Sequence, residues 1–184
     1  MIRIQELNLR RIHPTDAEAY LELLEALAAE SPHVLYQPGE YGSGARDEMA
    51  QIESVLARPN QMIFVVEDRD RLIAWLGAFG ERYQRVAHTA LLGIGVLGAY
   101  QRRGIGQALF QEAERWARAA SLRRLELLVQ SGNFPAISLY RKMGFQIEGT
   151  KRESYRIGGE YVDEYLMAKL LTPPPPPRNP YPKW

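Results

Sequence analysis

The hydrophobic positions along this chain recur with two spacings, one typical of helices and one typical of strands. Apolar side chains three or four residues apart predict helices at about residues 15–29, 47–57, 104–120 and 134–143. Alternating or continuous apolar runs predict strands at 2–12, 62–67, 72–79, 87–97 and 125–129, and two more that flank Gly158-Gly159. The mixed order of strands and helices predicts an α/β fold.

Local signals indicate where several of these elements begin and turn. Thr15 and Glu18 form a capping-box pattern at the start of the first helix. Asp68-Arg69-Asp70 and Gly158-Gly159 each separate two strands and predict hairpins. The third helix and the strands on either side of it have the lengths of a parallel βαβ crossover.

Length and composition predict one globular domain followed by a tail. The 184 residues are 46% hydrophobic and 24% charged, an ordinary balance for a chain that buries a sizeable core. We expect the domain to span residues 1–171. Residues 172–184, TPPPPPRNPYPKW, contain five consecutive prolines, which favour an extended polyproline helix over a packed element.

Charge and residue counts exclude several kinds of function. Lysine and arginine number 23 against 22 acidic residues, so no general attraction to nucleic acid is expected. The chain has no cysteine, and the three histidines, His13, His33 and His88, lack a paired metal spacing, so we expect no metal site. Neither a secretion signal nor an apolar run of about 18 residues is found, and we expect a cytoplasmic protein without a membrane segment.

Two arginines and two glycines stand directly before the third helix, in Gln101-Arg102-Arg103-Gly104-Ile105-Gly106. Glycine leaves backbone N–H groups unshielded at a helix start, where unpaired amides and the helix dipole favour an anion. The arginines add positive charge. This pattern predicts a phosphate site, although glycines that only shape a turn beside solvated arginines are an equal alternative.

Two known phosphate motifs fit this region poorly. A P-loop requires G-x-x-x-x-G-K-S/T, and neither the lysine nor the hydroxyl is present. Gly93-Ile94-Gly95-Val96-Leu97-Gly98 does satisfy G-x-G-x-x-G, the dinucleotide fingerprint, but the helical pattern begins only after Gly104. The candidate acids Glu112 and Glu114 would also lie inside that helix. A nicotinamide-dependent oxidoreductase therefore remains only a distant alternative.

From about Ala90 to Leu171 the chain resembles the GNAT superfamily of acyl-CoA N-acyltransferases. The family signature Q/R-x-x-G-x-G/A corresponds to Gln101–Gly106, and a second signature, N-x-x-A-x-x-L-Y-x-K-x-G-F, to Asn133–Phe145. Both motifs stand in the right order with a strand between them. The resemblance implies a mostly antiparallel mixed sheet with one parallel crossover and flanking helices, and acetyl-CoA as cosubstrate without a metal.

The resemblance also implies which residues hold acetyl-CoA. The glycine-rich turn would bind the pyrophosphate through Gln101, Arg102, Arg103, Gly104, Ile105, Gly106 and Gln107. The preceding strand would contact the pantetheine arm and polarise the thioester carbonyl through the backbone of Ile94, Gly95 and Val96. The fourth helix would add Asn133 and Lys142 beside the CoA arm and Tyr140 near the sulfur. A plain core aromatic is the alternative for Tyr140.

The reaction implied is direct attack of a neutral amine on the thioester, with Tyr140 protonating the departing thiolate. A lysine-like amine is almost fully protonated at pH 7, so a base is expected. Residues 87–97 contain no acid, which leaves two candidates. Glu126 resembles the glutamate of ribosomal-protein N-terminal acetyltransferases, with a solvated charge as its alternative, and Glu81 follows another strand.

The acceptor is not specified by the sequence. Tyr36, Tyr41, Trp75 and Tyr83 are candidates for its pocket, although aromatics at strand spacing more often belong to a core. We expect a small-molecule or peptide amine and leave a homodimer open. A protein that binds acetyl-CoA as a sensor, without transferring the acetyl group, is the main alternative function.

Overall fold

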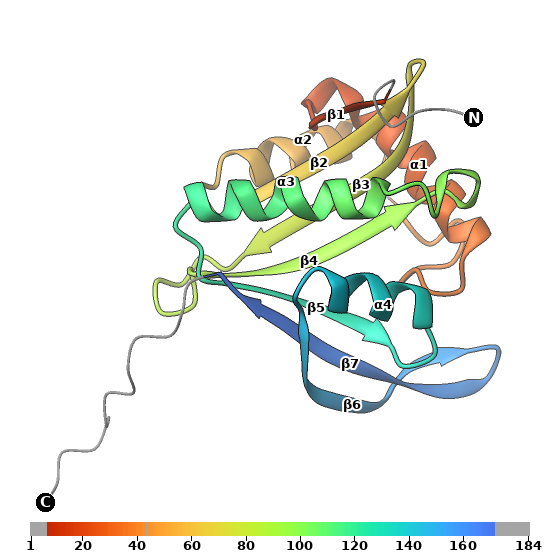
Figure 1. The fold of residues 1–184 in the computed structure, drawn as a ribbon. Coiled ribbons are helices and arrows are strands. Elements are labelled where there is room, and N and C mark those ends of the chain that lie inside the picture. The colour runs from red at the N-terminus through yellow and green to blue at the C-terminus, as the bar shows by residue number, and fades with distance from the viewer. Residues whose placement is uncertain (1–6, 43, 172–184) are drawn as a thin grey trace, which may run out of the picture.

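The computed structural model describes residues 7–42 and 44–171, which build a seven-stranded sheet with helices on both faces (Figure 1). The strands are β1 (Asn8–Arg11), β2 (Gln61–Asp68), β3 (Arg71–Gly80), β4 (Thr89–Val96), β5 (Arg124–Gln130), β6 (Gln146–Ile157) and β7 (Glu160–Leu170). The helices are α1 (Ala17–Glu30), α2 (Ala45–Leu56), α3 (Ile105–Ala119) and α4 (Phe134–Lys142), with 3₁₀ turns η2 (Pro14–Asp16) and η3 (Gly98–Tyr100).

The predicted fold class is confirmed. The strand order is β1-β2-β3-β4-β5-β7-β6, and every neighbouring pair is antiparallel except β4–β5, which α3 connects in parallel. Most element ends differ from the prediction by a few residues. Of the strand predicted at 2–12, the described part is a strand only at Asn8–Arg11. Residues 1–6 and the predicted tail at 172–184 lie outside the described residues.

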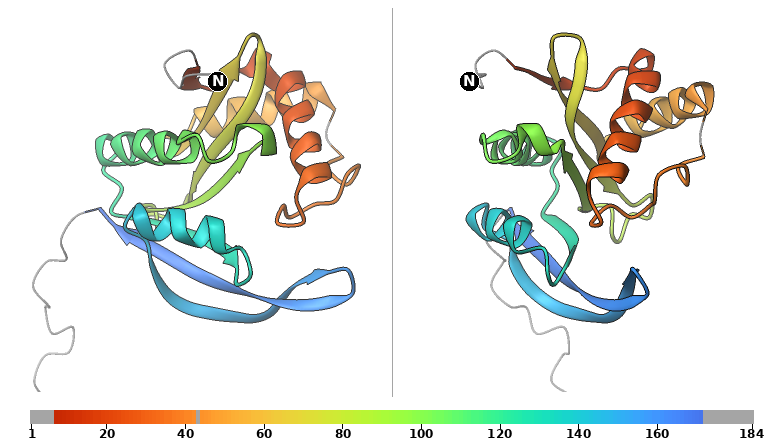
Figure 2. Two further views of the ribbon diagram at one scale, coloured as in Figure 1. Left: turned by 45° about the vertical axis from the view of Figure 1, so that its right-hand side comes forward. Right: turned by 90° about the vertical axis from the view of Figure 1, so that its right-hand side faces the viewer.

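The helices divide between the two faces of the sheet. The right-hand view of Figure 2 shows α1 and α2 on one face and α3 and α4 on the other. On the first face, the Tyr20 ring of α1 meets Trp75 of β3 edge-on at 5.8 Å. On the second face, Trp116 of α3 meets Phe64 of β2 at 6.4 Å. The apolar stripes read from the sequence therefore form two cores separated by the sheet.

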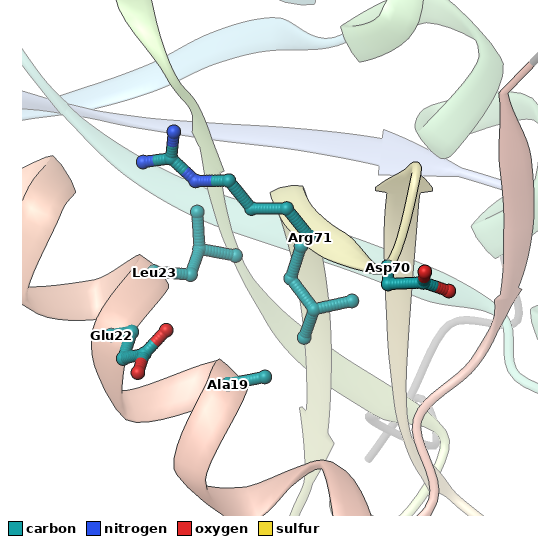
Figure 3. A pocket seen from close by; sticks show the side chains of 6 residues that line it. Ala19, Glu22, Leu23, Asp70 and Arg71 are labelled. Atoms are coloured by element: carbon teal, nitrogen blue, oxygen red, sulfur yellow. The ribbon is translucent and has the colours of Figure 1, made fainter.

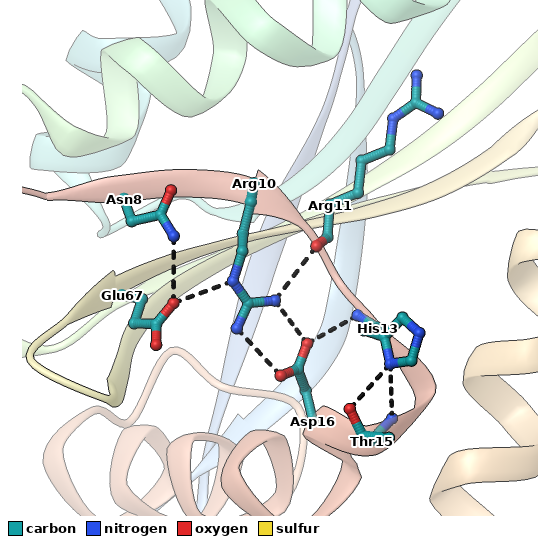
Figure 4. A network of polar contacts seen from close by, with 7 residues as sticks. All are labelled: Asn8, Arg10, Arg11, His13, Thr15, Asp16 and Glu67. Atoms are coloured by element: carbon teal, nitrogen blue, oxygen red, sulfur yellow. Dashed lines mark hydrogen bonds and ion pairs between the residues drawn. The ribbon is translucent and has the colours of Figure 1, made fainter.

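The start of α1 differs from the predicted capping box at Thr15 and Glu18. His13 accepts a hydrogen bond from the Thr15 N–H at 3.3 Å, and the Asp16 carboxylate accepts one from the His13 N–H at 2.7 Å. Figure 4 shows that Arg10 joins this turn to the sheet, because its guanidinium reaches Asp16 at 2.6 Å and Glu67 of β2 at 3.0 Å. The cap thus stands at η2, before α1 begins.

Both predicted hairpin turns are present. Arg69 and Asp70 join β2 to β3 with φ values of 48° and 66°, and Gly158 and Gly159 join β6 to β7 with 56° and 96°. Positive φ at both central residues suits the right-handed twist of the flanking strands. Glycine adopts this conformation freely, which explains why the second turn was evident from the sequence.

The dinucleotide fingerprint at residues 93–98 lacks its required structural context. Gly93 and Gly95 lie inside β4 rather than at a strand-to-helix turn, and α3 begins only at Ile105. A Cβ at Gly95 would stand 2.8 Å from Nε1 of Trp75, so these glycines make room for the indole ring. The nicotinamide alternative therefore loses the feature on which it depended.

Candidate active site

The parallel pair β4–β5 is short, and the two strands separate along most of their length. Thr89 pairs with Arg124 and Leu91 with Glu126, and no later pair joins these strands in the described part of the chain. Both strands nevertheless continue, to Val96 and Gln130. We call the space between their unpaired ends, 92–96 and 127–130, the β4–β5 gap.

Backbone groups of β4 alternate between the β3 side and the gap side, as they do in any antiparallel strand. The Leu97 N–H donates to the Ile73 carbonyl at 3.0 Å, so odd-numbered residues bond to β3. The His88 carbonyl accepts from the Arg124 N–H on the other side at 3.2 Å. The peptide groups that face the gap are therefore those of Leu92, Ile94 and Val96, whereas the Gly95 backbone faces β3.

The turn between β4 and α3 holds an unusual backbone conformation. Arg102 has φ 61° and Gly104 has φ 86°, while Arg103 between them does not have a positive φ. Such alternation turns successive N–H groups toward one side and forms an anion-binding concavity. Gln101 anchors the turn, because its side-chain amide donates to the Val96 carbonyl at 2.9 Å.

The first turn of α3 adds unpaired donors to this concavity. The Ala108 N–H donates to the Gly104 carbonyl at 3.0 Å, so the preceding N–H groups of Ile105, Gly106 and Gln107 have no intrahelical acceptor. The helix dipole also favours an anion here. Arg102 and Arg103 are both exposed beside these donors. The residues predicted to bind a phosphate thus share one turn.

Gly106 brings the start of α3 against β4, which borders the gap, and against α4. A Cβ at this position would stand 2.9 Å from Cδ2 of Leu139 on α4 and 3.9 Å from Cδ1 of Ile94 on β4. The absence of a side chain therefore allows this close packing. Consequently the anion-binding turn, the gap and α4 meet in one place.

Tyr140 of α4 is packed among aromatic rings, but its hydroxyl is not sealed. Its ring lies 5.4 Å from Phe110 and 6.3 Å from Phe145, and only 7% of the residue is exposed. The Tyr140 hydroxyl forms no hydrogen bond with the described residues. Among those residues, every polar side-chain atom that is fully enclosed has a hydrogen-bond partner. The hydroxyl therefore touches accessible space. Burial raises the pKa of Tyr140 to about 12, so the group stays protonated at neutral pH.

The other two residues predicted on this helix have different surroundings. The Asn133 side-chain oxygen accepts from the Ala136 N–H at 3.3 Å and caps α4, so that atom already has a structural task. Lys142 is exposed at the last position of the helix. Because α-helical residues are about 100° apart, Lys142 points away from Tyr140, about 200° around the axis.

Glu126 lies on β5 where the gap begins. Leu125 pairs with Lys169 of β7, and Lys169 bonds to Glu114 of α3 at 2.5 Å, so the Leu125 side chain lies on the α3 face of the sheet. Because side chains alternate along a strand, the neighbouring Glu126 lies on the opposite face, that of α1. The Arg124 guanidinium binds the Glu126 carboxylate at 2.7 Å. Its register partner Leu91 is three residues from Ile94, about 10 Å along the strand. Only a proton transfer through water can connect these positions.

Glu81 is not brought to the gap. It follows Gly80, the last residue of β3, which pairs with Ala90 near the start of β4. Ile94 is four residues further along β4, about 13 Å at the usual rise per residue. Glu81 is also exposed, with its backbone carbonyl accepting from the Asn60 side chain at 2.9 Å. This position does not suit a base for a reaction in the gap.

Aromatic side chains line the α1 side of the sheet next to the gap. The Trp75 indole lies over β4, since a Cβ at Gly93 would be 3.1 Å from its Cη2. The rings of Tyr36 and Tyr41 lie 4.8 Å apart in the segment between α1 and α2. Tyr83, by contrast, is 60% exposed in the connection from β3 to β4. Three of the four aromatics predicted for an acceptor pocket are therefore on one face.

The segment between α1 and α2 is attached to the far end of the gap. Gln130, the last residue of β5, bonds to His33 at 2.5 Å and donates to the Pro32 carbonyl at 3.4 Å. The Tyr155 hydroxyl of β6 donates to the Val34 carbonyl. These bonds hold the segment across the α1 side of the gap, opposite α3 and α4.

Sequence reasoning missed the buried acid Glu48 on this side. Glu48 is only 2% exposed, and its carboxylate accepts a hydrogen bond from the Tyr41 hydroxyl at 3.2 Å. One signal was available, because Glu48 stands four residues before buried Ile52 and thus on the apolar stripe of α2.

A separate hollow of about 180 Å³ lies between α1 and the β2–β3 hairpin. Figure 3 shows Glu22 and Arg71 at its rim. None of its lining residues belongs to β4, β5 or the anion-binding turn. Across residues 7–42 and 44–171, no three acidic or histidine side chains gather as a metal site would require, and no helix is long and apolar enough to cross a membrane.

Comparisons with known proteins agree with this geometry. The family model described as Acetyltransferase (GNAT) family matches residues 21–145, which is more than half of the chain. The chain belongs to this family. An acetyltransferase of the GNAT family from Streptococcus pneumoniae is 29% identical, with 90% of this chain and 99% of that chain covered at a TM-score of 0.87.

Curated GNAT relatives are more similar in sequence but over shorter stretches. L-amino acid N-acetyltransferase AaaT of Escherichia coli (strain K12) is 41% identical over 47% of this chain and 54% of the relative. N-alpha-acetyltransferase RimI of Mycobacterium tuberculosis is 42% identical over 41% of this chain and 45% of the relative. The chain therefore spans about half the length of these relatives. A putative acetyltransferase from Salmonella typhimurium, solved with its cofactor acetyl-CoA, shares the fold at 16% identity, with 94% and 98% of the two chains covered and a TM-score of 0.81.

Proposed function

We propose that this chain transfers the acetyl group of acetyl-CoA to a primary amine, by direct attack of the amine on the thioester. One observation carries the proposal: unpaired peptide groups of β4 face a gap that adjoins an anion-binding turn, beside an α4 that holds an accessible tyrosine hydroxyl. Membership of the GNAT family supports the same activity. When bound, acetyl-CoA supplies the activated acyl group.

The residues of the β4–α3 turn fit the pyrophosphate of CoA. The N–H groups of Ile105, Gly106 and Gln107 would donate to its oxygens, and the exposed guanidinium groups of Arg102 and Arg103 would offset its charge. Gln101 and the positive φ of Gly104 would hold the turn in shape. These interactions use the backbone more than the side chains.

The gap side of β4 fits the rest of the CoA arm. The peptide groups of Ile94 and the N–H of Val96 are free of β3 and would pair with the amides of the pantetheine chain, whereas the Val96 carbonyl already accepts from Gln101. One of these N–H groups would polarise the thioester carbonyl, because an oriented donor in a site that excludes water stabilises developing negative charge. Gly106 would keep α3 close enough to form one wall.

Two groups would handle protons. The Tyr140 hydroxyl, held protonated by its burial, would donate to the thiolate that leaves. Glu126 would accept the proton of the incoming ammonium through water, since it faces the side from which an acceptor enters. An acceptor with a neutral α-amine would depend less on this base than a lysine-like amine.

The first test measures thermal unfolding with acetyl-CoA, CoA, NAD and NADPH added separately, followed by CoA release with a panel of amines. A ligand at 100 times its dissociation constant stabilises by about 2.7 kcal/mol, which raises the Tm by several degrees at this size. We expect shifts with the CoA species alone and acetylation of at least one amine. A CoA shift without any transfer would instead indicate a sensor, and a nicotinamide shift would overturn the proposal.

A further inference from the structure

The buried acid Glu48 lacks the positive partner that such a group normally has. It lies in the first turn of α2 and is 2% exposed. Among the described residues, its carboxylate accepts one side-chain hydrogen bond, from the neutral Tyr41 hydroxyl. None of the ion pairs among these residues includes Glu48. Glutamate is rarely buried so fully without a counter-charge. Burial raises the pKa of Glu48, and the bond from Tyr41 opposes this only in part.

Three tyrosines lie near this carboxylate. The Tyr36 and Tyr41 rings lie 4.8 Å apart, and buried Tyr20 is close enough to interact electrostatically with both and with Glu48. The charged groups that act on these three tyrosines are carboxylates, Glu25 and Glu48, with no cation among them in the described chain. Aromatic faces beside a carboxylate form the composition that attracts an organic cation.

Packed aromatic rings connect the cluster to the reaction site. Every fully enclosed polar atom of the described side chains has a hydrogen-bond partner. The Tyr20 hydroxyl forms no hydrogen bond with the described residues, so it is not fully enclosed. The Tyr20 ring rests against Trp75, and Trp75 covers Gly93 and Gly95 of β4. A chain of aromatic contacts therefore runs from β4, beside the gap, toward Glu48.

The position of Glu48 suits the binding of a charged group better than the transfer of a proton. Helix α2 packs on β2, two strands away from β4. Neighbouring strands are about 4.8 Å apart, so the carboxylate lies on the order of 10 Å from the gap. A base must reach the amine directly or through water. Glu126 stands on a strand that borders the gap and is better placed for that role, whereas Glu48, two strands away, suits a second charge on an extended acceptor.

We propose that Glu48, Tyr36 and Tyr41 bind the second ammonium group of the acceptor, which is a diamine or a polyamine. This inference rests on the proposed acetyltransferase function. The first amine would lie at the gap and the methylene chain would cross Trp75. A free amino acid fits poorly, because its carboxylate would approach Glu48 without a cation to offset the repulsion.

The test compares cadaverine with n-pentylamine, which has the same chain and only one amine. We expect the wild-type kcat/KM for cadaverine to exceed that for n-pentylamine at least tenfold, and Glu48→Gln to bring the ratio close to one. Glu53→Gln is the matched control, because Glu53 is an exposed acid on the same helix. Its ratio should equal that of the wild type. A wild-type ratio near one, or an unchanged ratio in Glu48→Gln, would overturn the subsite.

A second variant covers the case in which Glu48→Gln does not fold. Tyr36 is only partly buried, so Tyr36→Leu should preserve the Tm and the stabilisation by acetyl-CoA. We expect it to raise KM for cadaverine about fivefold or more and to leave n-pentylamine unchanged. An equal change for both amines, or better turnover of L-amino acids or peptides than of cadaverine, refutes the assignment. Transfer to no amine at all would instead refute the acetyltransferase function itself.

Discussion

The two sides of the β4–β5 gap are built in different ways. On the α3 side, the anion-binding turn and the start of α3 come from consecutive residues, 101–107, and act mainly through backbone N–H groups. On the α1 side, the aromatic and acidic side chains come from α1, the α1–α2 segment, α2 and β3. A site made of backbone needs a local conformation, whereas a site made of side chains depends on how distant elements pack.

This difference has a consequence for specificity. The cosubstrate side, as we propose it, depends on glycine positions and helix geometry, which tolerate few changes of residue type. The acceptor side, as we propose it, depends on individual side chains such as Glu48 and Tyr36. Variants on the two sides should therefore affect different quantities: the binding of acetyl-CoA on the α3 side and the preference among amines on the α1 side.

The largest effect is expected for Tyr140→Phe. Removing the hydroxyl leaves the ring packed against Phe110 and Phe145, so the Tm and the stabilisation by acetyl-CoA should not change. General acid catalysis typically contributes 10²–10⁴-fold, and we expect kcat to fall by about a thousandfold. Steady-state CoA release measures the effect. Full activity would mean that Tyr140 serves only as a core aromatic.

Glu126→Gln tests whether Glu126 acts as the base, by comparing acceptor amines that differ in how fully they are protonated. We expect kcat to fall about a hundredfold for a lysine-like amine and much less for an α-amine, because a larger fraction of α-amine is already neutral. Acetyl-CoA binding should be unchanged. Arg124→Gln serves as the matched control, since it removes the partner at 2.7 Å but keeps the carboxylate. Equal losses for both amines would contradict the role of a base.

Gly104→Val should damage the cosubstrate side alone. Gly104 has φ 86°, and a left-handed conformation costs an ordinary residue about 1–2 kcal/mol, more if it is β-branched. We expect about tenfold weaker acetyl-CoA binding, measured by titration, with an unchanged preference among amines. The control is Gly132→Val, because a Cβ at Gly132 meets nothing within 4 Å. Unchanged binding in Gly104→Val would show that the turn does not hold the pyrophosphate.

The sequence predicted the turn before α3 and the crossover better than the aromatic and acidic cluster on the α1 side, for a physical reason. The turn before α3 and the parallel crossover are local features, visible as glycine spacing and apolar periodicity. The cluster at Glu48 depends on contacts between segments far apart in the chain, which no local pattern encodes. The cap at His13 was missed because the accepting group is a histidine ring nitrogen, which takes the bond from the Thr15 N–H, rather than the hydroxyl of Thr15 acting one turn later.

Lys169 and Glu81 illustrate the same limit on individual residues. Lys169 links β7 to Glu114 of α3 and to the Met143 carbonyl at the end of α4, and no local pattern in the sequence indicates these contacts. Glu81 follows a strand, as many catalytic residues do, but strand register carries it away from the gap. Register depends on the pairing of whole strands and is not readable from one of them.

The smallest effect is expected for Asp16→Asn, which loosens the anchor of α1 and hence the acceptor side. Burial alone would raise the pKa of Asp16, but hydrogen bonds from Arg10 and the His13 N–H outweigh it and hold the pKa below 3.8. A lowered pKa stabilises the fold above about pH 4, and this contribution is lost as the pH falls through the folded-state value. Loss of the charge-assisted bonds should cost about 1–2 kcal/mol of unfolding free energy at pH 7. Denaturant titrations should therefore show that the difference in unfolding free energy between the variant and the wild type narrows below pH 4. A difference that stays constant with pH would mean that packing, not charge, holds this turn.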